Sequence, residues 1–341
     1  MRLAWCGHSA KANNARTACP ADAPFPDAWG AQGARSGTVQ VMSTNATPPR
    51  SFGSVATAMV TPFHQDGKVD LDTAASLATH LVELGCDALV INGTTGESPT
   101  THQPEKDALV RVVLEAVGDR AMIIGAASSN DTAHAVRMAK GQQAAGAHGL
   151  LIVTPYYNRP SQQGLIAHVE AIAEATDVPL MLYDIPGRTG LAIGDEALDR
   201  FAEHPRILAV KDATGNVPAG FERMARTGLE YYSGDDDLNF AWLAHGASGV
   251  VSVVGHVIAG LYAEMVQEVD DGDLVAARRV ATAARTIVQV MMGTGQGAVM
   301  AKEAMHLQGH LPSPTVRLPL VRATDEEIAA LKTVLLEEGL L

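Results

Sequence analysis

The most constraining feature of this sequence is a repeated alternation of short apolar runs with longer segments of helical periodicity. From residue 53 onward, the apolar runs alternate with segments whose apolar residues lie three and four positions apart. A run that is apolar along its whole length is typical of a parallel strand that is covered on both faces. We expect strands at 55–61, 88–92, 122–126, 149–154, 180–185, 207–211, 230–234 and 249–254.

Eight strand–helix units in succession fit a closed parallel barrel better than an open sheet. A doubly wound sheet is the alternative, but no Gly-x-Gly-x-x-Gly segment opens a helix after the first strand. After the last strand the sequence predicts only helices, at 261–269, 274–292, 297–307 and 326–338. This tail is too long for one closing helix. We therefore predict an α/β fold, with a (β/α)8 TIM barrel over 51–272 and an appended C-terminal helical region over 273–341.

The start of the chain differs in composition from the rest. Residues 1–41 are rich in Ala, Gly, Ser, Asn and Pro, and they lack both sustained periodicity and the apolar core of a secretory signal. We expect 1–50 to be a disordered extension, or a segment upstream of a true start at Met42. Because the segment is poor in acidic residues, an organelle transit peptide is a further alternative.

Composition excludes several classes of function. The formal net charge of -13 argues against binding to nucleic acid and to acidic membrane surfaces. No apolar run approaches the roughly 18 residues of a membrane-spanning helix. The three cysteines form no Cys-x-x-Cys pair, which favours a reduced, cytoplasmic protein.

A lysine follows the sixth apolar run directly. Four apolar residues, 207–210, lead into Lys211, so this side chain is expected at the carboxyl end of a buried strand. Burial disfavours the ammonium form, lowers the pKa and makes the free amine available to attack a ketone and form a Schiff base. The alternative is a lysine that extends toward solvent or pairs with Asp212.

Other strand ends add polar groups to the same rim of the barrel, where the chemistry of this fold is located. The segment 93–97, Gly-Thr-Thr-Gly-Glu, offers backbone N–H groups and two hydroxyls that suit a carboxylate or phosphate. Its alternative is an ordinary glycine turn. Tyr183 lies near the end of the strand before that of Lys211, where a phenol can exchange protons. Its alternative is a tyrosine that only fills the barrel.

These segments together resemble a known superfamily. Segment 93–97, Tyr183 with Arg-Thr-Gly at 188–190, and Lys-Asp-Ala-Thr-Gly at 211–215 are similar to the class I, Schiff-base aldolase superfamily of dihydrodipicolinate synthase and N-acetylneuraminate lyase. The resemblance runs from residue 51 to the C-terminus and is strongest to the dihydrodipicolinate synthase family. It implies a lyase that condenses pyruvate with L-aspartate 4-semialdehyde to 4-hydroxy-tetrahydrodipicolinate, in lysine biosynthesis through diaminopimelate.

The resemblance also implies catalytic roles. Lys211 matches the lysine that forms the Schiff base with pyruvate, and Tyr183 matches the tyrosine that moves protons at that imine. Thr94 matches the threonine that links two tyrosines in a proton relay. Tyr157 matches the second tyrosine of the relay, which in this family reaches into the active site of a neighbouring subunit.

Four further residues match substrate-binding positions of the family. Thr95 matches a residue that binds pyruvate, Gly234 lies on the same rim, and Val251 matches the residue whose backbone contacts pyruvate. Arg188 matches the arginine that pairs with the carboxylate of the second substrate, for which its planar guanidinium is suited. This arginine disfavours sugar-acid lyases. A 4-hydroxy-2-oxoglutarate aldolase stays open as an alternative, and a non-catalytic keto-acid sensor would be expected to lose Lys211 or Tyr183.

The resemblance implies a homo-oligomer, either a tetramer made of two dimers or a dimer. It implies no cofactor. We also expect no metal, because the three adjacent acids at 235–237 cannot all face one ion. A metal-dependent class II aldolase is thereby disfavoured.

Lysine inhibits some family members by binding at a separate site. The residues of this chain at that site differ in part from those of the lysine-sensitive enzymes. Three positions agree with that site, namely Ser98, Asn130 and Tyr156. However, Gln103 and Lys106 stand where sensitive enzymes often have histidines or other polar residues, and His134 replaces a glutamate. A cation at Lys106 would repel a lysine ligand, so the sequence predicts weak or absent feedback inhibition.

Overall fold

Eight strands close into a parallel barrel in the order of the sequence. The computed structural model describes residues 47–341. Each strand pairs with the next, and β1 also pairs with β8, so the barrel has no free edge. The strands are β1 (Val55–Ala58), β2 (Ala88–Ile91), β3 (Met122–Ala126), β4 (Gly149–Val153), β5 (Leu180–Asp184), β6 (Ile207–Asp212), β7 (Glu230–Ser233) and β8 (Gly249–Ser252). The predicted barrel is confirmed, and most strands stop one to three residues before their predicted ends.

The inside of the barrel is filled by a cluster of side chains, many of them small. This inner cluster includes Ala56, Ala88, Ile124, Met181 and Ala209. Phe52, which precedes β1, is fully buried in the same cluster. It leaves no space for a side chain at Gly149, where a Cβ would lie 2.8 Å from the phenyl ring.

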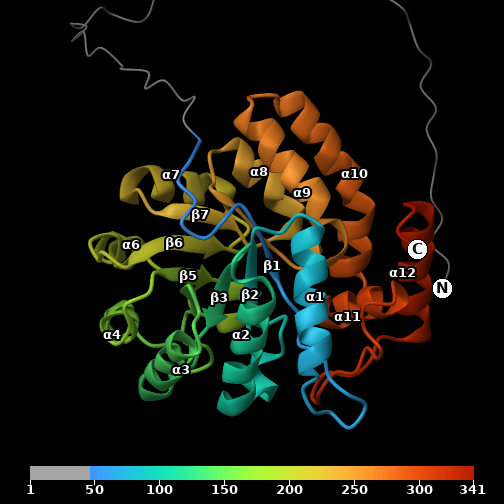
Figure 1. Cartoon of the computed structure of the whole chain (residues 1–341). Coiled ribbons are helices and arrows are strands. Elements are labelled where there is room, and N and C mark those ends of the chain that lie inside the picture. The colour runs from blue at the N-terminus through green and yellow to red at the C-terminus, as the bar shows by residue number, and fades with distance from the viewer. Residues whose placement is uncertain (1–46) are drawn as a thin grey trace, which may run out of the picture. The chain divides into compact units, whose positions relative to one another are not determined.

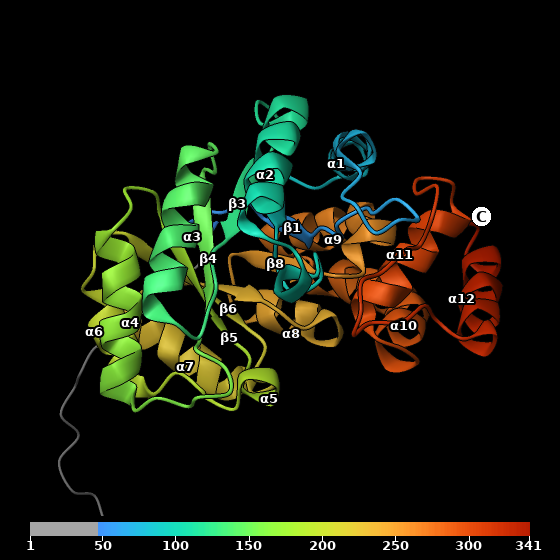
Figure 2. The same cartoon turned by 90° about the horizontal axis from the view of Figure 1, so that it is seen from below.

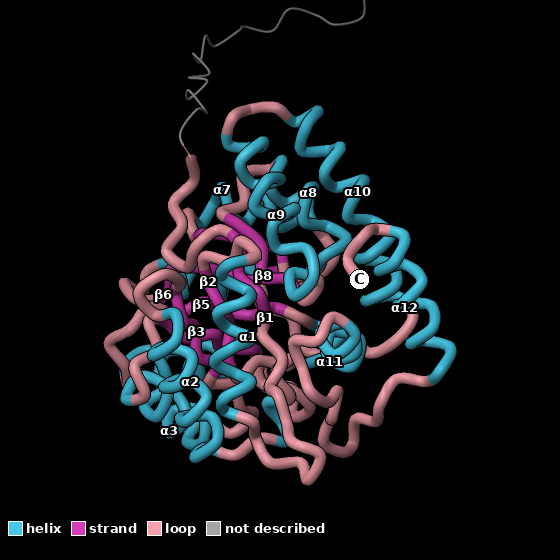
Figure 3. Tube along the Cα trace, turned by 45° about the vertical axis from the view of Figure 1, so that its right-hand side comes forward, coloured by secondary structure: helices cyan, strands magenta, loops and turns pink. Residues whose placement is uncertain are grey.

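Helices surround the strands (Figure 3). Those of the barrel are α1 (Leu71–Glu83), α2 (Gln103–Val117), α3 (Thr132–Ala144), α4 (Gln162–Glu174), α5 (Pro186–Thr189), α6 (Asp195–Ala202), α7 (Val217–Thr227), α8 (Asn239–Ala244) and α9 (Gly255–Asp270), with short 3-10 turns η1 (Ser98–Thr100) and η2 (Asp236–Leu238). Polar side chains cap several helix starts, where they accept hydrogen bonds from otherwise unpaired backbone N–H groups. The caps of α1, α3 and α4 are Asp70, Asp131 and Ser161.

Helix α9 begins six residues earlier than the sequence predicts. Its first turn is anchored by Asp236 of η2, whose carboxylate accepts hydrogen bonds from the backbone of Val253 at 2.9 Å and Val254 at 3.2 Å. The Tyr262 hydroxyl donates to the same carboxylate at 3.0 Å. Because this anchor comes from another loop and Ile258 has non-helical backbone angles, local periodicity did not indicate the start.

The predicted C-terminal helical region is present as three helices, α10 (Leu274–Gly293), α11 (Gly297–Leu307) and α12 (Asp325–Glu337). Figures 1 and 2 show them grouped on one flank, away from α4 and α6. Met300 and Leu331 share a buried cluster with Leu77 of α1. The predicted boundary at 272 and 273 falls between α9 and α10. However, the described residues belong to one compact unit, so the division into two domains stays a prediction.

The first described residues are bound to the barrel. The Arg50 guanidinium forms an ion pair with Asp270 at 2.8 Å and donates to the Ser248 carbonyl at 2.9 Å. The backbone N–H of Ser51 donates to Glu230 at 2.7 Å. The expectation of a disordered extension falls mostly on residues 1–46, which lie outside the described residues. Within residues 47–341, no helix has the length and apolar content that are needed to cross a membrane.

Candidate active site

Lys211 lies at the carboxyl end of β6 and is almost completely buried, with 5% of its surface exposed. Its register partners are Tyr183 on β5 and Tyr232 on β7. The Lys211 Nζ atom is 4.2 Å from the centre of the Tyr183 ring. The sequence placed this lysine at a buried strand end, and the structure brings it into contact with the predicted tyrosine.

The environment of Lys211 increases the fraction of neutral amine. Burial lowers the pKa of Lys211 from 10.5 to about 8, the charge of Asp236 raises it in part, and the charge of Arg188 lowers it further. At pH 7, a group with that pKa is neutral in about one molecule in ten, against fewer than one in a thousand for an ordinary lysine. A nucleophilic amine is therefore available near neutral pH.

Tyr183 is held in the protonated form. Burial raises the pKa of its phenol to about 12, although the charge of Arg188 lowers it in part. A neutral phenol next to the amine can donate a proton to a group formed there and take it back.

Six of the eight residues singled out from the sequence line one cavity of about 180 Å³ at this end of the barrel. They are Thr94, Thr95, Tyr183, Arg188, Lys211 and Gly234. Gly234 is required for space, because a Cβ at this position would lie 2.9 Å from the Cγ and Cε atoms of Lys211. The arrangement places an amine, a phenol and a guanidinium around a space for a small molecule.

The turn 93–97 carries donors for an anion. Its backbone is fixed by a hydrogen bond from the Thr61 hydroxyl to the Gly96 carbonyl at 2.7 Å and by one from the Glu97 N–H to the Thr94 carbonyl at 3.1 Å. Within residues 47–341, the backbone N–H groups of Thr94 and Thr95 donate to no protein acceptor. They remain available for a carboxylate oxygen, as the sequence predicted for this turn.

The other two predicted residues lie outside this cavity. Val251 is buried among the inner side chains of the barrel, whereas Val253, just after β8, lines the cavity.

Tyr157 is 90% exposed and has a positive φ of 73°, which is uncommon for a residue other than glycine. In this single chain, Tyr157 therefore does not approach Lys211 closely enough to line its cavity. Thr94 also makes no side-chain hydrogen bond to either tyrosine among the described residues.

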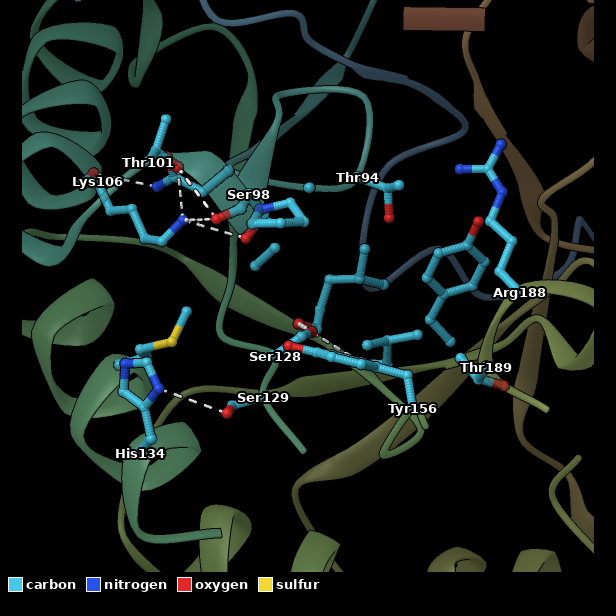
Figure 4. A pocket seen from close by; sticks show the side chains of 18 of the residues that line it. Thr94, Ser98, Thr101, Lys106, Ser128, Ser129, His134, Tyr156, Arg188 and Thr189 are labelled. Atoms are coloured by element: carbon cyan, nitrogen blue, oxygen red, sulfur yellow. Dashed lines mark hydrogen bonds between the residues drawn. The ribbon is translucent and has the colours of Figure 1, made fainter. Parts of the chain in front are cut away.

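A second cavity of about 380 Å³ adjoins the first (Figure 4). The two share the walls formed by Thr94, Tyr183 and Arg188. Its lining includes residues that the sequence compared with a lysine-binding site, namely Ser98, Gln103, Lys106, His134 and Tyr156. Figure 4 shows Lys106 and His134 on the side away from Arg188.

Lys106 is buried and fully hydrogen-bonded. Its ammonium donates to the Ser98 carbonyl at 2.8 Å, to the Ser98 hydroxyl at 3.1 Å and to the Thr101 hydroxyl at 2.6 Å. Burial lowers the pKa of Lys106 to about 8, while the charge of Glu105 raises it in part. All three acceptors are neutral oxygens. The Lys106 ammonium therefore places a positive charge here, and none of its hydrogen bonds goes to a carboxylate.

Sequence reasoning missed several residues of the site. Met292 of α10 and Val253 line the catalytic cavity, and Asp236 acts on the charge state of Lys211. No local pattern marks Met292, because it reaches the barrel only through the packing of the C-terminal helical region. In the described part of the chain, no group of three His, Cys, Asp or Glu side chains is placed to hold a metal ion, and Asp236 serves instead as the anchor of α9.

The barrel and its buried amine beside a tyrosine define the class of this protein, an enzyme built on a (β/α)8 barrel. The comparisons with known proteins narrow the class. The family model described as the dihydrodipicolinate synthetase family matches residues 51–338. The chain therefore belongs to the dihydrodipicolinate synthetase family.

Individual relatives agree with this assignment. The chain is 54% identical over 298 residues to 4-hydroxy-tetrahydrodipicolinate synthase of Kineococcus radiotolerans, covering 87% of this chain and 97% of that one. A crystal structure of the enzyme from Cyanidioschyzon merolae with lysine bound is 40% identical, with a TM-score of 0.81 over 85% of this chain and 99% of that one. A monomeric dihydrodipicolinate synthase variant is 35% identical, with a TM-score of 0.81 over 85% of this chain and 98% of that one.

Proposed function

We propose that this protein condenses pyruvate with L-aspartate 4-semialdehyde through a Schiff base on Lys211, giving 4-hydroxy-tetrahydrodipicolinate for lysine biosynthesis. The observation that carries the proposal is the burial of Lys211 beside Tyr183, in a cavity whose turn 93–97 offers free N–H donors. The names of the relatives at about half identity support the same reaction.

In the first half-reaction, the neutral amine of Lys211 adds to the ketone carbon of pyruvate and water leaves, which gives an iminium. The iminium withdraws electrons, so a methyl proton of pyruvate can be removed to form an enamine. Tyr183 donates and accepts the protons of these steps. Thr95 and the N–H groups of its turn hold the pyruvate carboxylate, and the backbones at Gly234 and Val253, which line the cavity, complete its binding site.

In the second half-reaction, the enamine carbon attacks the aldehyde carbon of the second substrate, and the aldehyde oxygen takes a proton. The amine of that substrate then attacks the iminium carbon, closes the ring and releases Lys211. Arg188 binds the carboxylate of the second substrate, for which its guanidinium is suited. Arg188 is exposed and lines both cavities, which supports a role at the entrance to the site.

Tyr157 completes the relay from another copy of the chain. Its side chain is 90% exposed on a loop with positive φ at both Tyr157 and Arg159. Backbone strain of this kind persists where surroundings or function maintain it. A homo-oligomer, either a dimer or a tetramer of two dimers, would bring this tyrosine to the Thr94 of its partner. The monomeric variant among the relatives makes the oligomeric state a point to be measured.

Two further expectations belong to this function. Inhibition by lysine is weak or absent, because the Lys106 ammonium lies in the cavity where a lysine ligand would bind.

The location of the protein is the cytoplasm, where cysteines stay reduced and small metabolites are available. Fractionation of cells that produce the protein tests the location.

A comparison of second substrates tests the reaction. Purified protein is supplied with pyruvate and either L-aspartate 4-semialdehyde, glyoxylate or N-acetylmannosamine, and consumption of pyruvate is followed. We expect turnover with the semialdehyde to exceed the others by at least about a hundredfold in kcat/KM, because the semialdehyde alone carries both a carboxylate for Arg188 and the amine that closes the ring and releases Lys211. Equal or greater turnover with either other aldehyde would contradict the proposal.

A further inference from the structure

A buried ion pair joins the C-terminal helical region to the turn 93–97. The Lys302 ammonium, on α11, donates to the Glu97 carboxylate and to the Thr315 carbonyl, the second at 2.7 Å. The two charged side chains are 0% and 1% exposed and come from positions 205 residues apart. Separation of this pair would leave two buried charges uncompensated, which is costly. The pair therefore fixes the position of α11 relative to the turn 93–97.

The second carboxylate oxygen of Glu97 is bound from the same region. The backbone N–H of Arg317 donates to it at 2.9 Å. The Arg317 side chain then extends along the loop after the turn, donating to the Thr100 carbonyl at 2.7 Å and to both oxygens of Glu105. The ring of Phe63 packs against both cations, 4.1 Å from Lys302 Nζ and 4.4 Å from Arg317 Cζ.

Glu97 itself has a strained backbone. Its φ of 56° lies in the left-handed region, which costs a residue with a Cβ free energy unless its surroundings maintain it. Its N–H donates to the Thr94 carbonyl, so the conformation of Glu97 and the orientation of the Thr94 peptide are coupled. The unpaired Thr95 N–H belongs to the same peptide as that carbonyl and depends on its orientation. The Thr94 N–H belongs to the preceding peptide, whose Gly93 carbonyl accepts the Ser98 N–H at 3.2 Å.

We propose that Lys302 and Glu97 are positioning residues, through which the C-terminal helical region holds the turn 93–97 in the geometry that binds the carboxylate of the keto acid. The inference rests on the proposed function of this turn as a pyruvate site. It assigns the appended helices a part in substrate affinity, although Lys302 does not touch the substrate. Loss of the pair lets the turn relax, so the donors lose the orientation in which they bind the carboxylate.

The test is a double variant, Glu97→Gln with Lys302→Met, which removes both charges and leaves no unpaired buried ion. The chain offers a control in the next residue of α11. Glu303 is 1% exposed and pairs at 2.7 Å with Arg322, whose side chain is 59% exposed, and neither side chain has a hydrogen bond or ion pair to the turn among the described residues. The control is therefore Glu303→Gln with Arg322→Met.

For both variants, thermal unfolding, kcat and KM are measured, together with the pyruvate concentration that gives half of the maximal borohydride-trapped adduct. We expect the Glu97–Lys302 variant to raise the pyruvate KM and the trapping midpoint about tenfold or more, with a smaller change in kcat. The control variant should change both midpoints less than about twofold. If the double variant does not fold, Lys302→Arg, which keeps the charge and changes the geometry, is measured in the same way.

An unchanged pyruvate midpoint in a folded Glu97–Lys302 variant would overturn the inference. An equal rise in the control would also overturn it, because the effect would then reflect general destabilisation of α11. Failure of the proposed function is recognised separately. In that case the unsubstituted protein forms no adduct with pyruvate at any concentration.

Discussion

Two tyrosines flank Lys211 in register, but their hydroxyls have different surroundings. Tyr183 lines the catalytic cavity, and its ring contacts the amine. The Tyr232 hydroxyl instead donates to Glu230 at 3.0 Å and accepts the N–H of Phe52 at 3.2 Å. At the residue scale, the proton donor beside Lys211 is therefore expected to be Tyr183, which lines the cavity, and not Tyr232, whose hydroxyl is bound elsewhere.

Replacement of each tyrosine by phenylalanine separates the two roles. We expect Tyr183→Phe to lower kcat by about 10²–10³-fold without unfolding the protein, because a proton donor at the imine is lost. Tyr232→Phe should leave kcat within a few-fold but lower the free energy of unfolding by about 1 kcal/mol, through a lost buried hydrogen bond. Steady-state kinetics and thermal unfolding of both variants check this pair, and equal losses of kcat would contradict it.

Much of the candidate site could be predicted from the sequence, because Lys211 and Tyr183 lie at the ends of apolar runs and the turn 93–97 follows one. Met292, Asp236 and Lys302 could not. They act on the site through contacts between segments that are distant in the sequence, such as the contact between Glu97 and Lys302, which are 205 positions apart. Local periodicity has no information about such contacts.

At the scale of elements, β5 and β6 carry a second pair on the opposite face from Tyr183 and Lys211. Asp184 and Asp212 are register partners, and both are almost completely buried. Burial and then the charge of Asp212 raise the pKa of Asp184 from 3.8 to about 7. Between these pH values, the folded protein binds more protons at Asp184 than the unfolded chain does. The free energy of unfolding therefore falls as the pH rises from about 4 to 7, and the loss is complete above pH 7.

The variant Asp184→Asn removes this titration. We expect it to increase the free energy of unfolding at pH 8 by roughly 1–4 kcal/mol relative to the unsubstituted protein, with little gain at pH 4. Denaturant unfolding at the two pH values measures the difference. Asp237→Asn, at an exposed position of η2, is the control and should have no such pH-dependent gain. An equal effect of Asp184→Asn at both pH values would contradict the argument.

The second cavity is also a property of elements, since η1, α2 and α3 bring Ser98, Lys106 and His134 together. Because the Lys106 ammonium already uses three acceptors, we expect less than half inhibition of turnover at about 1 mM lysine. Calorimetry with lysine should likewise detect no binding in this range. The Cyanidioschyzon merolae relative, crystallised with lysine bound, is the positive control. Strong inhibition well below 1 mM would overturn the expectation.

Element boundaries show where sequence patterns fail. The strands were predicted within a few residues, because parallel strands buried on both faces are apolar throughout. The start of α9 was predicted six residues too late, because the Asp236 carboxylate that anchors it belongs to another loop.

At the scale of the whole molecule, the exposed Tyr157 predicts that one chain is not the complete enzyme. We expect sedimentation velocity to find a dimer or tetramer, and Tyr157→Phe to lower kcat at least about tenfold while leaving the assembly intact. Tyr156→Phe is the neighbouring control, since its backbone carbonyl, rather than its hydroxyl, accepts the bond from Asn130. A fully active monomer would contradict this account.

Reduction of the protein with borohydride in the presence of pyruvate, followed by peptide mapping, tests the central claim most directly. The account predicts one added pyruvate-derived group, located on Lys211, with a rate of formation that rises with pH to a midpoint near 8, as expected for the lowered pKa of this amine. An adduct on any other residue, or none at all, would contradict it.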